Sequence, residues 1–115
     1  MSEEVEEFKE ERERLNDIIM DYAGKDIKRF FSLDNSVYRE GAIPPKYKEM
    51  LGLVASTVLK CDDCIEYHMI RCKEEGVTDE EMVEALGIAL IVGGSITIPH
   101  LRNAFELWDE MDEEE

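Results

Sequence analysis

Apolar residues recur along most of the 115-residue chain at the three- and four-residue spacing of an α-helix. No stretch alternates between apolar and polar residues for long enough to predict a β-strand. The spacing predicts six helices, at about residues 2–22, 26–38, 44–59, 61–75, 78–93, and from 97 into the acidic tail DEMDEEE, where the last helix is expected to fray. We therefore expect an all-α fold, in the form of a compact six-helix domain.

Three of the predicted helices carry specific start or stop signals. Pro44 and Pro45 favour a helix start, because proline fits the first turn, whose amide hydrogens have no partner. Gly76 is typical of a residue that ends a helix. Thr78 and Glu81 have the spacing of a capping box.

The apolar faces of the helices predict what the fold buries. The third helix is apolar on nearly all sides from Met50 to Leu59, which is typical of a central, buried helix. The residues expected to face inward are Ile27, Phe30, Phe31 and Leu33 in the second helix, and Leu101, Ala104, Phe105 and Trp108 in the last. One small core cannot cover this much apolar surface, so we expect a homo-oligomer.

Length and charge narrow the class of protein. Thirteen Lys and Arg residues against 29 Asp and Glu residues give a formal net charge of −16, which argues against binding to nucleic acid or to an anionic membrane surface. No apolar run approaches the ~20 residues of a membrane span. The acidic start MSEEVEEFKEERER is unlike a signal peptide. Residues 1–115 are therefore expected to form one cytoplasmic domain.

The segment KCDDCIEYHMIRC carries the most informative chemistry. At the start of a helix, Cys61, Cys64 and His68 share one face. Two thiols one turn apart can close a disulfide, and the unpaired amides of a helix N-terminus stabilise a thiolate. The imidazole can accept the Cys64 proton. Asp62 and Asp63 oppose this effect with negative charge beside the sulfurs.

Two other interpretations of the segment remain open. Because Cys72 continues the same face, the three cysteines could fill a core beside a hydrogen-bonded histidine. Alternatively, the segment could bind zinc through Cys61, Cys64, His68 and Cys72. On a continuous helix, however, positions 61 and 72 lie ~16 Å apart, far beyond the reach of one ion. His100, the other histidine, is interpreted as a surface or packing residue.

Glu49 is a further candidate, because it opens the most apolar helix. An acidic residue in a first turn is commonly solvated, and the helix dipole stabilises its negative charge. A carboxylate drawn into the core needs a partner, and His68 would be a suitable one. The carboxylate would then orient the imidazole and raise its basicity toward Cys64.

Together these residues resemble the pattern of the carboxymuconolactone decarboxylase superfamily, and within it the alkylhydroperoxidase (AhpD-like) branch. That pattern has a glutamate twelve residues before a CxxC pair, a histidine four residues after the second cysteine, and a Gly-x-[ST]-x-[DE]-[DE] helix start. Here it is formed by Glu49, Cys61-Asp62-Asp63-Cys64, His68 and GVTDEEMVEAL. The core of the match covers about residues 44–93.

The resemblance implies an all-helical fold that assembles as trimers or hexamers, with a redox-active cysteine pair and no bound cofactor or metal. It implies that Cys64 is the thiol served by His68 and Glu49, and that Cys61 is its disulfide partner. The substrate would be a small hydroperoxide or disulfide. An external dithiol, carried by a lipoyl-bearing or thioredoxin-like protein, would restore the thiols.

The chain departs from the pattern at Asp63, where the peroxidase members have a histidine. It also resembles the short, single-unit members of the superfamily. We expect an AhpD-like thiol oxidoreductase, acting as a peroxidase or disulfide reductase through the CxxC pair and a Glu–His proton relay. The alternatives are a carboxymuconolactone-decarboxylase-like lyase, a branch that lacks the cysteine pair, and a non-catalytic oligomeric binding protein with inert or zinc-binding cysteines.

Overall fold

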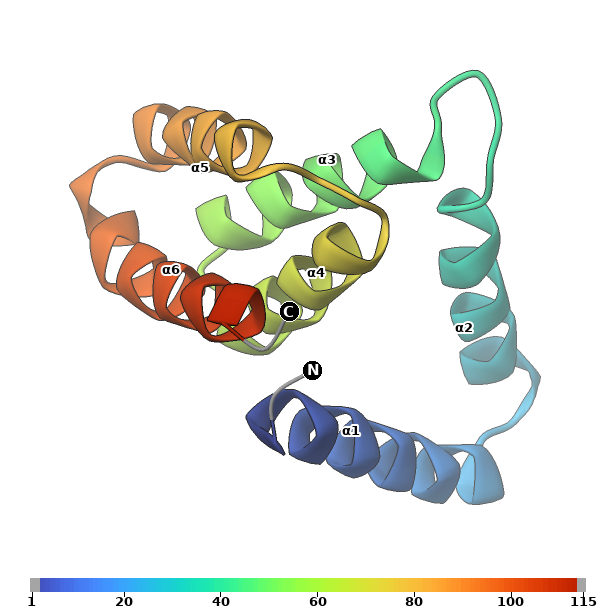
Figure 1. Ribbon diagram of the computed structural model, residues 1–115. Coiled ribbons are helices and arrows are strands. Elements are labelled where there is room, and N and C mark those ends of the chain that lie inside the picture. The colour runs from blue at the N-terminus through green and yellow to red at the C-terminus, as the bar shows by residue number, and fades with distance from the viewer. Residues whose placement is uncertain (1–2, 114–115) are drawn as a thin grey trace. The chain divides into compact units, whose positions relative to one another are not determined.

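The computed structural model describes residues 3–113, and these residues form helices and connecting turns without a β-strand. The α-helices are α1 (Glu3–Tyr22), α2 (Lys25–Val37), α3 (Pro45–Val58), α4 (Asp62–Glu74), α5 (Asp79–Gly93) and α6 (Ile98–Glu113), with one 3-10 turn, η1 (Ser95–Thr97) (Figure 1). The predicted all-α fold is confirmed. The chain divides into two compact units, Met1–Arg39 and Glu40–Glu115, and the prediction of one domain stays a prediction.

The first unit contains α1 and α2. No residue of α2 is buried, and Phe30 and Leu33 are 69% and 60% exposed. The expectation that the second helix turns its apolar residues into a core is therefore wrong for this chain by itself. The spacing of the apolar residues is helical, but spacing does not reveal whether another element lies against that face.

The second unit contains α3 to α6 and holds the core that positions the candidate site. Helix α3 contacts α4 and α5, and α4 contacts α6 (Figure 1). The buried apolar residues of this unit are Leu53, Ile65, Met69, Ile70, Cys72, Val77, Met82, Ala85, Leu86, Ala89, Ala104, Leu107, Trp108 and Met111. Helices α3 and α4 therefore form the hairpin around which this unit is built.

Two expectations about these faces need correction. Helix α3 is not buried on nearly all sides, because Leu51 is 58% exposed and Leu59, the residue that caps its C-terminus, is 78% exposed. The elements that pack against it are α4 and α5. In α6, Phe105 is 40% exposed, whereas Leu107 and Met111 are buried. The buried stripe of α6 is thus rotated from the expected one, and the helix continues as far as Glu113. The expected fraying at the end of the tail falls on residues 114–115, which lie outside the described residues.

The signals at the helix ends are confirmed. Pro45 occupies the first turn of α3. Gly76 has a φ of +81°, the left-handed conformation that follows many helices. Thr78 and Glu81 form both hydrogen bonds of the capping box that begins α5. Among the described residues, no helix is long and apolar enough to span a membrane.

Candidate active site

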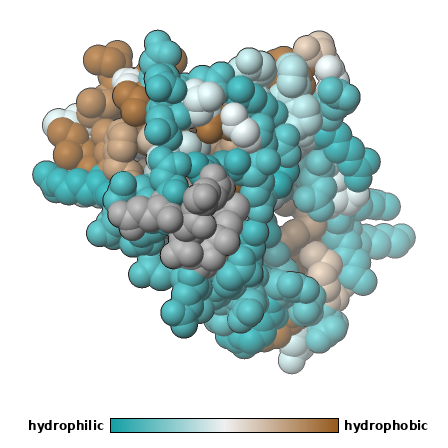
Figure 2. Space-filling view, in the orientation of Figure 1, coloured by the Kyte–Doolittle hydropathy of each residue, from teal (hydrophilic) through white to brown (hydrophobic). Residues whose placement is uncertain are grey.

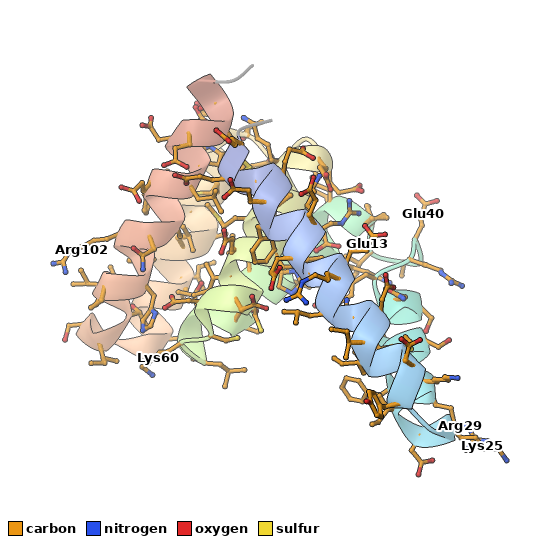
Figure 3. The ribbon with its side chains drawn as sticks, turned by 90° about the horizontal axis from the view of Figure 1, so that it is seen from below. Glu13, Lys25, Arg29, Glu40, Lys60 and Arg102 are labelled. Carbon is orange, nitrogen blue, oxygen red and sulfur yellow. The ribbon has the colours of Figure 1, made fainter. Side chains whose placement is uncertain are left out.

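The turn between α3 and α4 places the cysteine pair. Lys60 adopts a φ of +60°, which reverses the chain within a few residues. The backbone amide of Cys61 donates to the carbonyl of Ser56 over 3.1 Å. Cys61 is the N-cap of α4, because its backbone is extended and its side chain accepts from the amide of Cys64. The side chain of Lys60 lies at the edge of the molecule in Figure 3. This tight turn makes α3 and α4 antiparallel neighbours.

Cys61 and Cys64 lie on the first turn of α4 and are both free thiols. The backbone amide of Cys64 donates to Cys61 Sγ over 3.4 Å. Amide donors at a helix N-terminus stabilise negative charge on an atom in this position. The hydrogen bond between the Cys64 thiol and the Cys61 sulfur, helped by partial burial and by the charge of Asp63, raises the pKa of Cys64 to about 11.

Glu49 and His68 form a buried pair, as the sequence predicts. Glu49 Oε1 and His68 Nδ1 lie 2.9 Å apart, across the packed helices α3 and α4. Glu49 is 3% exposed and His68 is 8% exposed. The Tyr67 ring and the imidazole also meet in a T-shaped arrangement, with the two ring centroids 5.1 Å apart. A carboxylate in this position fixes the orientation of the ring and increases its ability to hold a proton.

Arg71 is a third member of this cluster, and the sequence analysis missed it. Its Nε lies 3.6 Å from the second carboxylate oxygen of Glu49. Its other guanidinium nitrogens contact Glu74 at 2.7 Å and Glu75 at 3.0 Å. The sequence contains a signal for it, because position 71 is one helical turn after His68. Each oxygen of Glu49 therefore has a basic partner.

The surroundings of Cys72 differ from those of the two other cysteines. It is fully buried, and this burial, with a smaller effect from the charge of Glu49, raises the pKa of its thiol to about 12. A buried thiol of this kind is inert. Among residues 3–113 no three His, Cys, Asp or Glu side chains are gathered as a metal-binding group, so the geometry gives no support to the zinc alternative.

His100 lies closer to the cysteine segment than its position in the sequence implies. Its Nδ1 is 2.7 Å from Asp62 Oδ1, so α6 contacts the first residue of α4. No local pattern of residues indicates this pair, because 38 residues separate its members. The fold of α4 against α6 brings them together.

The fold and the site define an all-helical protein with a dithiol pair at a helix N-terminus and a buried carboxylate–histidine pair supplied by the same helix hairpin. The model of the carboxymuconolactone decarboxylase family matches residues 27–108. The chain belongs to this family.

Relatives of known structure share both the fold and much of the sequence. Two crystal structures of a Thermotoga maritima protein are 55% identical to this chain, with TM-scores of 0.91 and 0.90. They cover 93% of this chain and 94% and 91% of theirs. One of them is described as a carboxymuconolactone decarboxylase family protein with a candidate role in antioxidative response.

More distant relatives are consistent with this assignment. A Paracoccus denitrificans protein, "Uncharacterized protein 4 in cox locus", is 29% identical over 83 residues, which are 72% of this chain and 75% of that protein. A Legionella pneumophila carboxymuconolactone decarboxylase family protein, in its apo form, is 23% identical with a TM-score of 0.84, covering 95% of this chain and 97% of that one. The last likeness is one of fold alone.

Proposed function

We propose that this protein is a cytoplasmic thiol oxidoreductase of the AhpD-like branch, which reduces hydroperoxides by forming a Cys61–Cys64 disulfide. The observation that carries the proposal is the pairing of Cys61 Sγ with the amide of Cys64 at the start of α4. Two free thiols within one helical turn are arranged for disulfide exchange. The family relationship and the antioxidative-response description of the Thermotoga maritima relative support it.

The proposed reaction takes place in two steps. The Cys64 sulfur attacks the terminal oxygen of a hydroperoxide, the O–O bond breaks, and the alcohol leaves with a proton, giving a sulfenic acid. The Cys61 sulfur then attacks the Cys64 sulfur, the S–S bond forms and water leaves. Two electrons pass from the thiols to the peroxide. An external dithiol protein, of the lipoyl-bearing or thioredoxin-like kind, returns them.

The raised pKa of Cys64 gives the Glu49–His68 pair its proposed role. A thiol with a pKa of about 11 is almost fully protonated at neutral pH and needs a base to become a nucleophile. His68 stands one helical turn beyond Cys64, and Glu49 holds its Nδ1. We assign His68 as the base and Glu49 as the group that orients it.

Mild oxidation tests this function directly. Treatment of the reduced protein with an equimolar organic hydroperoxide should remove two hydrogens, localised by mass spectrometry to the peptide with Cys61 and Cys64. Cys72 should keep its thiol, because it is buried and protonated. The Cys61→Ser variant is the control, since its Cys64 can reach only the sulfenic acid. Oxidation to sulfonic acid without a disulfide, or no reaction at either sulfur, would contradict the proposal and favour a lyase or a binding protein.

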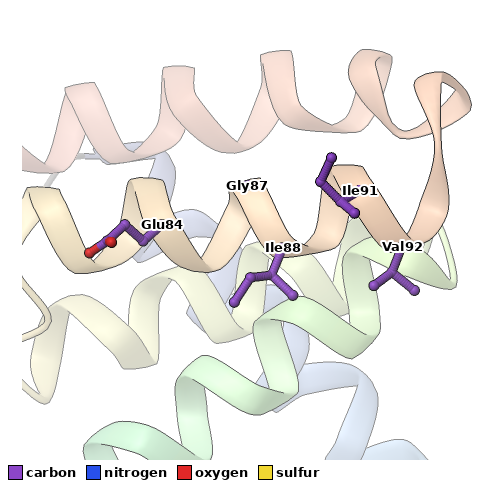
Figure 4. Close-up of a pocket in the computed structure, with 5 residues that line it drawn as sticks. All are labelled: Glu84, Gly87, Ile88, Ile91 and Val92. Atoms are coloured by element: carbon purple, nitrogen blue, oxygen red, sulfur yellow. The ribbon is translucent and has the colours of Figure 1, made fainter.

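We also propose that copies of this chain assemble through α5. Ile88, Ile91 and Val92 are 58%, 84% and 68% exposed, and with Glu84 and Gly87 they line a groove of about 350 Å³ (Figure 4). Figure 2 shows apolar residues gathered over α5. Because every copy carries a charge of −16, copies can meet only where acidic groups are few. One of these five lining residues is acidic.

Light scattering measures this assembly. We expect a mass of three or six times the 13.3 kDa of one chain at micromolar concentration. Ile91→Asp should lower the mass by placing a carboxylate in the apolar contact, whereas Glu80→Gln, on the exposed first turn of α5, should leave it unchanged. A parent protein that scatters as a 13.3 kDa monomer would contradict the proposed assembly.

A further inference from the structure

Helix α2 carries an exposed stripe of three residues, Arg29, Leu33 and Val37, which we call the α2 stripe. The four-residue spacing between them places them on one face of the helix. Leu33 and Val37 are 60% and 56% exposed, and the side chain of Arg29 is 73% exposed. Arg29 extends outward from the helix in Figure 3. The α2 stripe therefore begins with a positive charge and continues with two apolar side chains.

Helix α5 carries a stripe with the same spacing and the opposite charge. It consists of Glu84, Ile88 and Val92, which we call the α5 stripe. All three residues are exposed and line the groove of the proposed assembly. Figure 4 shows Ile88 and Val92 on the same side of the helix. The α5 stripe therefore begins with a negative charge and continues with two apolar side chains.

The two stripes match position by position when α2 of one copy lies parallel to α5 of another. The basic residue then meets the acidic one, and each apolar residue meets an apolar one. An antiparallel arrangement would instead set the charged residues against aliphatic ones, which costs the solvation of both charges. The parallel pairs are Arg29 with Glu84, Leu33 with Ile88, and Val37 with Val92.

The charge of the chain limits what can cover α5. Each copy has a net charge of −16, and α5 contains four acidic residues and no basic one. A second α5 would set acidic groups against acidic groups. Helix α2 contains three basic residues against two acidic ones, and none of its residues is buried. Because α2 is both apolar and slightly basic, it complements α5 in both respects.

We propose that the α5 groove of one copy is filled by α2 of a second copy. The inference rests on the proposed assembly through α5 and names the segment that completes it. Because the two surfaces differ, the contact is head-to-tail, and contacts of this kind can close into rings. A ring of three copies requires such a contact, since a surface that meets its own copy joins only two chains.

Light scattering of two complementary variants tests this pairing. Leu33→Asp and Ile88→Asp each place a carboxylate in the apolar part of the contact, so each variant alone should have a lower mass than the parent. An equimolar mixture of the two should be heavier than either variant alone, because one variant keeps an intact α2 and the other an intact α5. Asn35→Asp is the matched control, since it adds the same charge to α2 away from the stripe, and it should keep the mass of the parent.

An exchange of charges tests the parallel orientation. Arg29→Glu sets a like charge against Glu84 and should weaken the assembly about threefold in a dilution series. Glu84→Arg in the same chain restores an opposite pair and should return the strength to that of the parent. Lys28→Glu is the control, because it reverses a charge beside the stripe, and Glu84→Arg should not strengthen its assembly. The exchanged side chains are exposed, so this test holds if an aspartate variant fails to fold.

The results separate this inference from the proposals on which it rests. A Leu33→Asp variant with the mass of the parent, or a mixture no heavier than its components, would overturn the inference. The assembly through α5 would still stand if Ile91→Asp lowers the mass of the parent. A parent that scatters as a single chain contradicts both the assembly and this inference. The oxidation of Cys61 and Cys64 reports the thiol function independently of all these masses.

Discussion

Replacing His68 by Gln should slow the oxidation of the dithiol by hydroperoxide about 100-fold, because a positioned general base typically contributes at least this factor. Glu49→Gln should produce a smaller loss of the same kind, since the amide orients the imidazole without supporting its positive charge. The double variant should be little slower than His68→Gln, because both residues act on one proton path. Stopped-flow mixing of reduced protein with hydroperoxide gives the three rates.

A control for this prediction lies in the same cluster. Glu74 contacts Arg71 at 2.7 Å, whereas Glu49 is the carboxylate that contacts His68 Nδ1, at 2.9 Å. Glu74→Gln should therefore oxidise at nearly the parent rate. Two results would show that Cys64 is activated by another group. One is a rate loss in the double variant equal to the product of the losses in the two single variants, and the other is a His68→Gln variant as fast as the parent.

Cys72→Ala should make the loss of stability at alkaline pH smaller. Burial raises the pKa of Cys72 from its ordinary value of 9.0 to about 12 in the folded chain. Below pH 9 the thiol is protonated in both states and its contribution to the free energy of unfolding is complete. Above pH 9 only the unfolded chain releases this proton, so the free energy of unfolding falls by up to about 1.4 kcal/mol per pH unit until the folded thiol ionises.

Urea unfolding between pH 8 and pH 11, under reducing conditions, measures this slope. The parent should lose more stability than Cys72→Ala over that interval. Ile70→Val is the control, because Ile70 is also buried and loses one methyl group without losing a titrating one. It should be less stable by about 1 kcal/mol at every pH. Parallel pH profiles for the parent and Cys72→Ala would contradict the prediction.

The sequence predicted the local structure well because its signals are local. The capping box at Thr78 and Glu81 and the stop at Gly76 depend on a few neighbouring residues. The pairing of Glu49 with His68 could be predicted for a related reason. A carboxylate expected inside the fold needed a partner, and the sequence offered few candidates.

The sequence did not predict features set by packing between distant elements. The contact of His100 with Asp62 arises from α6 lying against α4, and no periodicity encodes it. The exposure of Leu51 and Phe105 likewise depends on which neighbours cover α3 and α6. Arg71 was missed because an arginine on an amphipathic helix usually lies in solvent, whereas here it reaches a buried carboxylate.

The N-cap position of Cys61 has a consequence for how the protein would cycle between its two states. Cys61 has φ −98° and ψ 96° and so lies outside the helical conformation, while its carbonyl already accepts the first helical bond from the amide of Ile65 over 2.9 Å. A disulfide can therefore close by rotation of the Cys61 side chain and adjustment of one non-helical residue. No turn of α4 needs to unwind, and the Glu49–His68 pair further along can keep its geometry through every turnover.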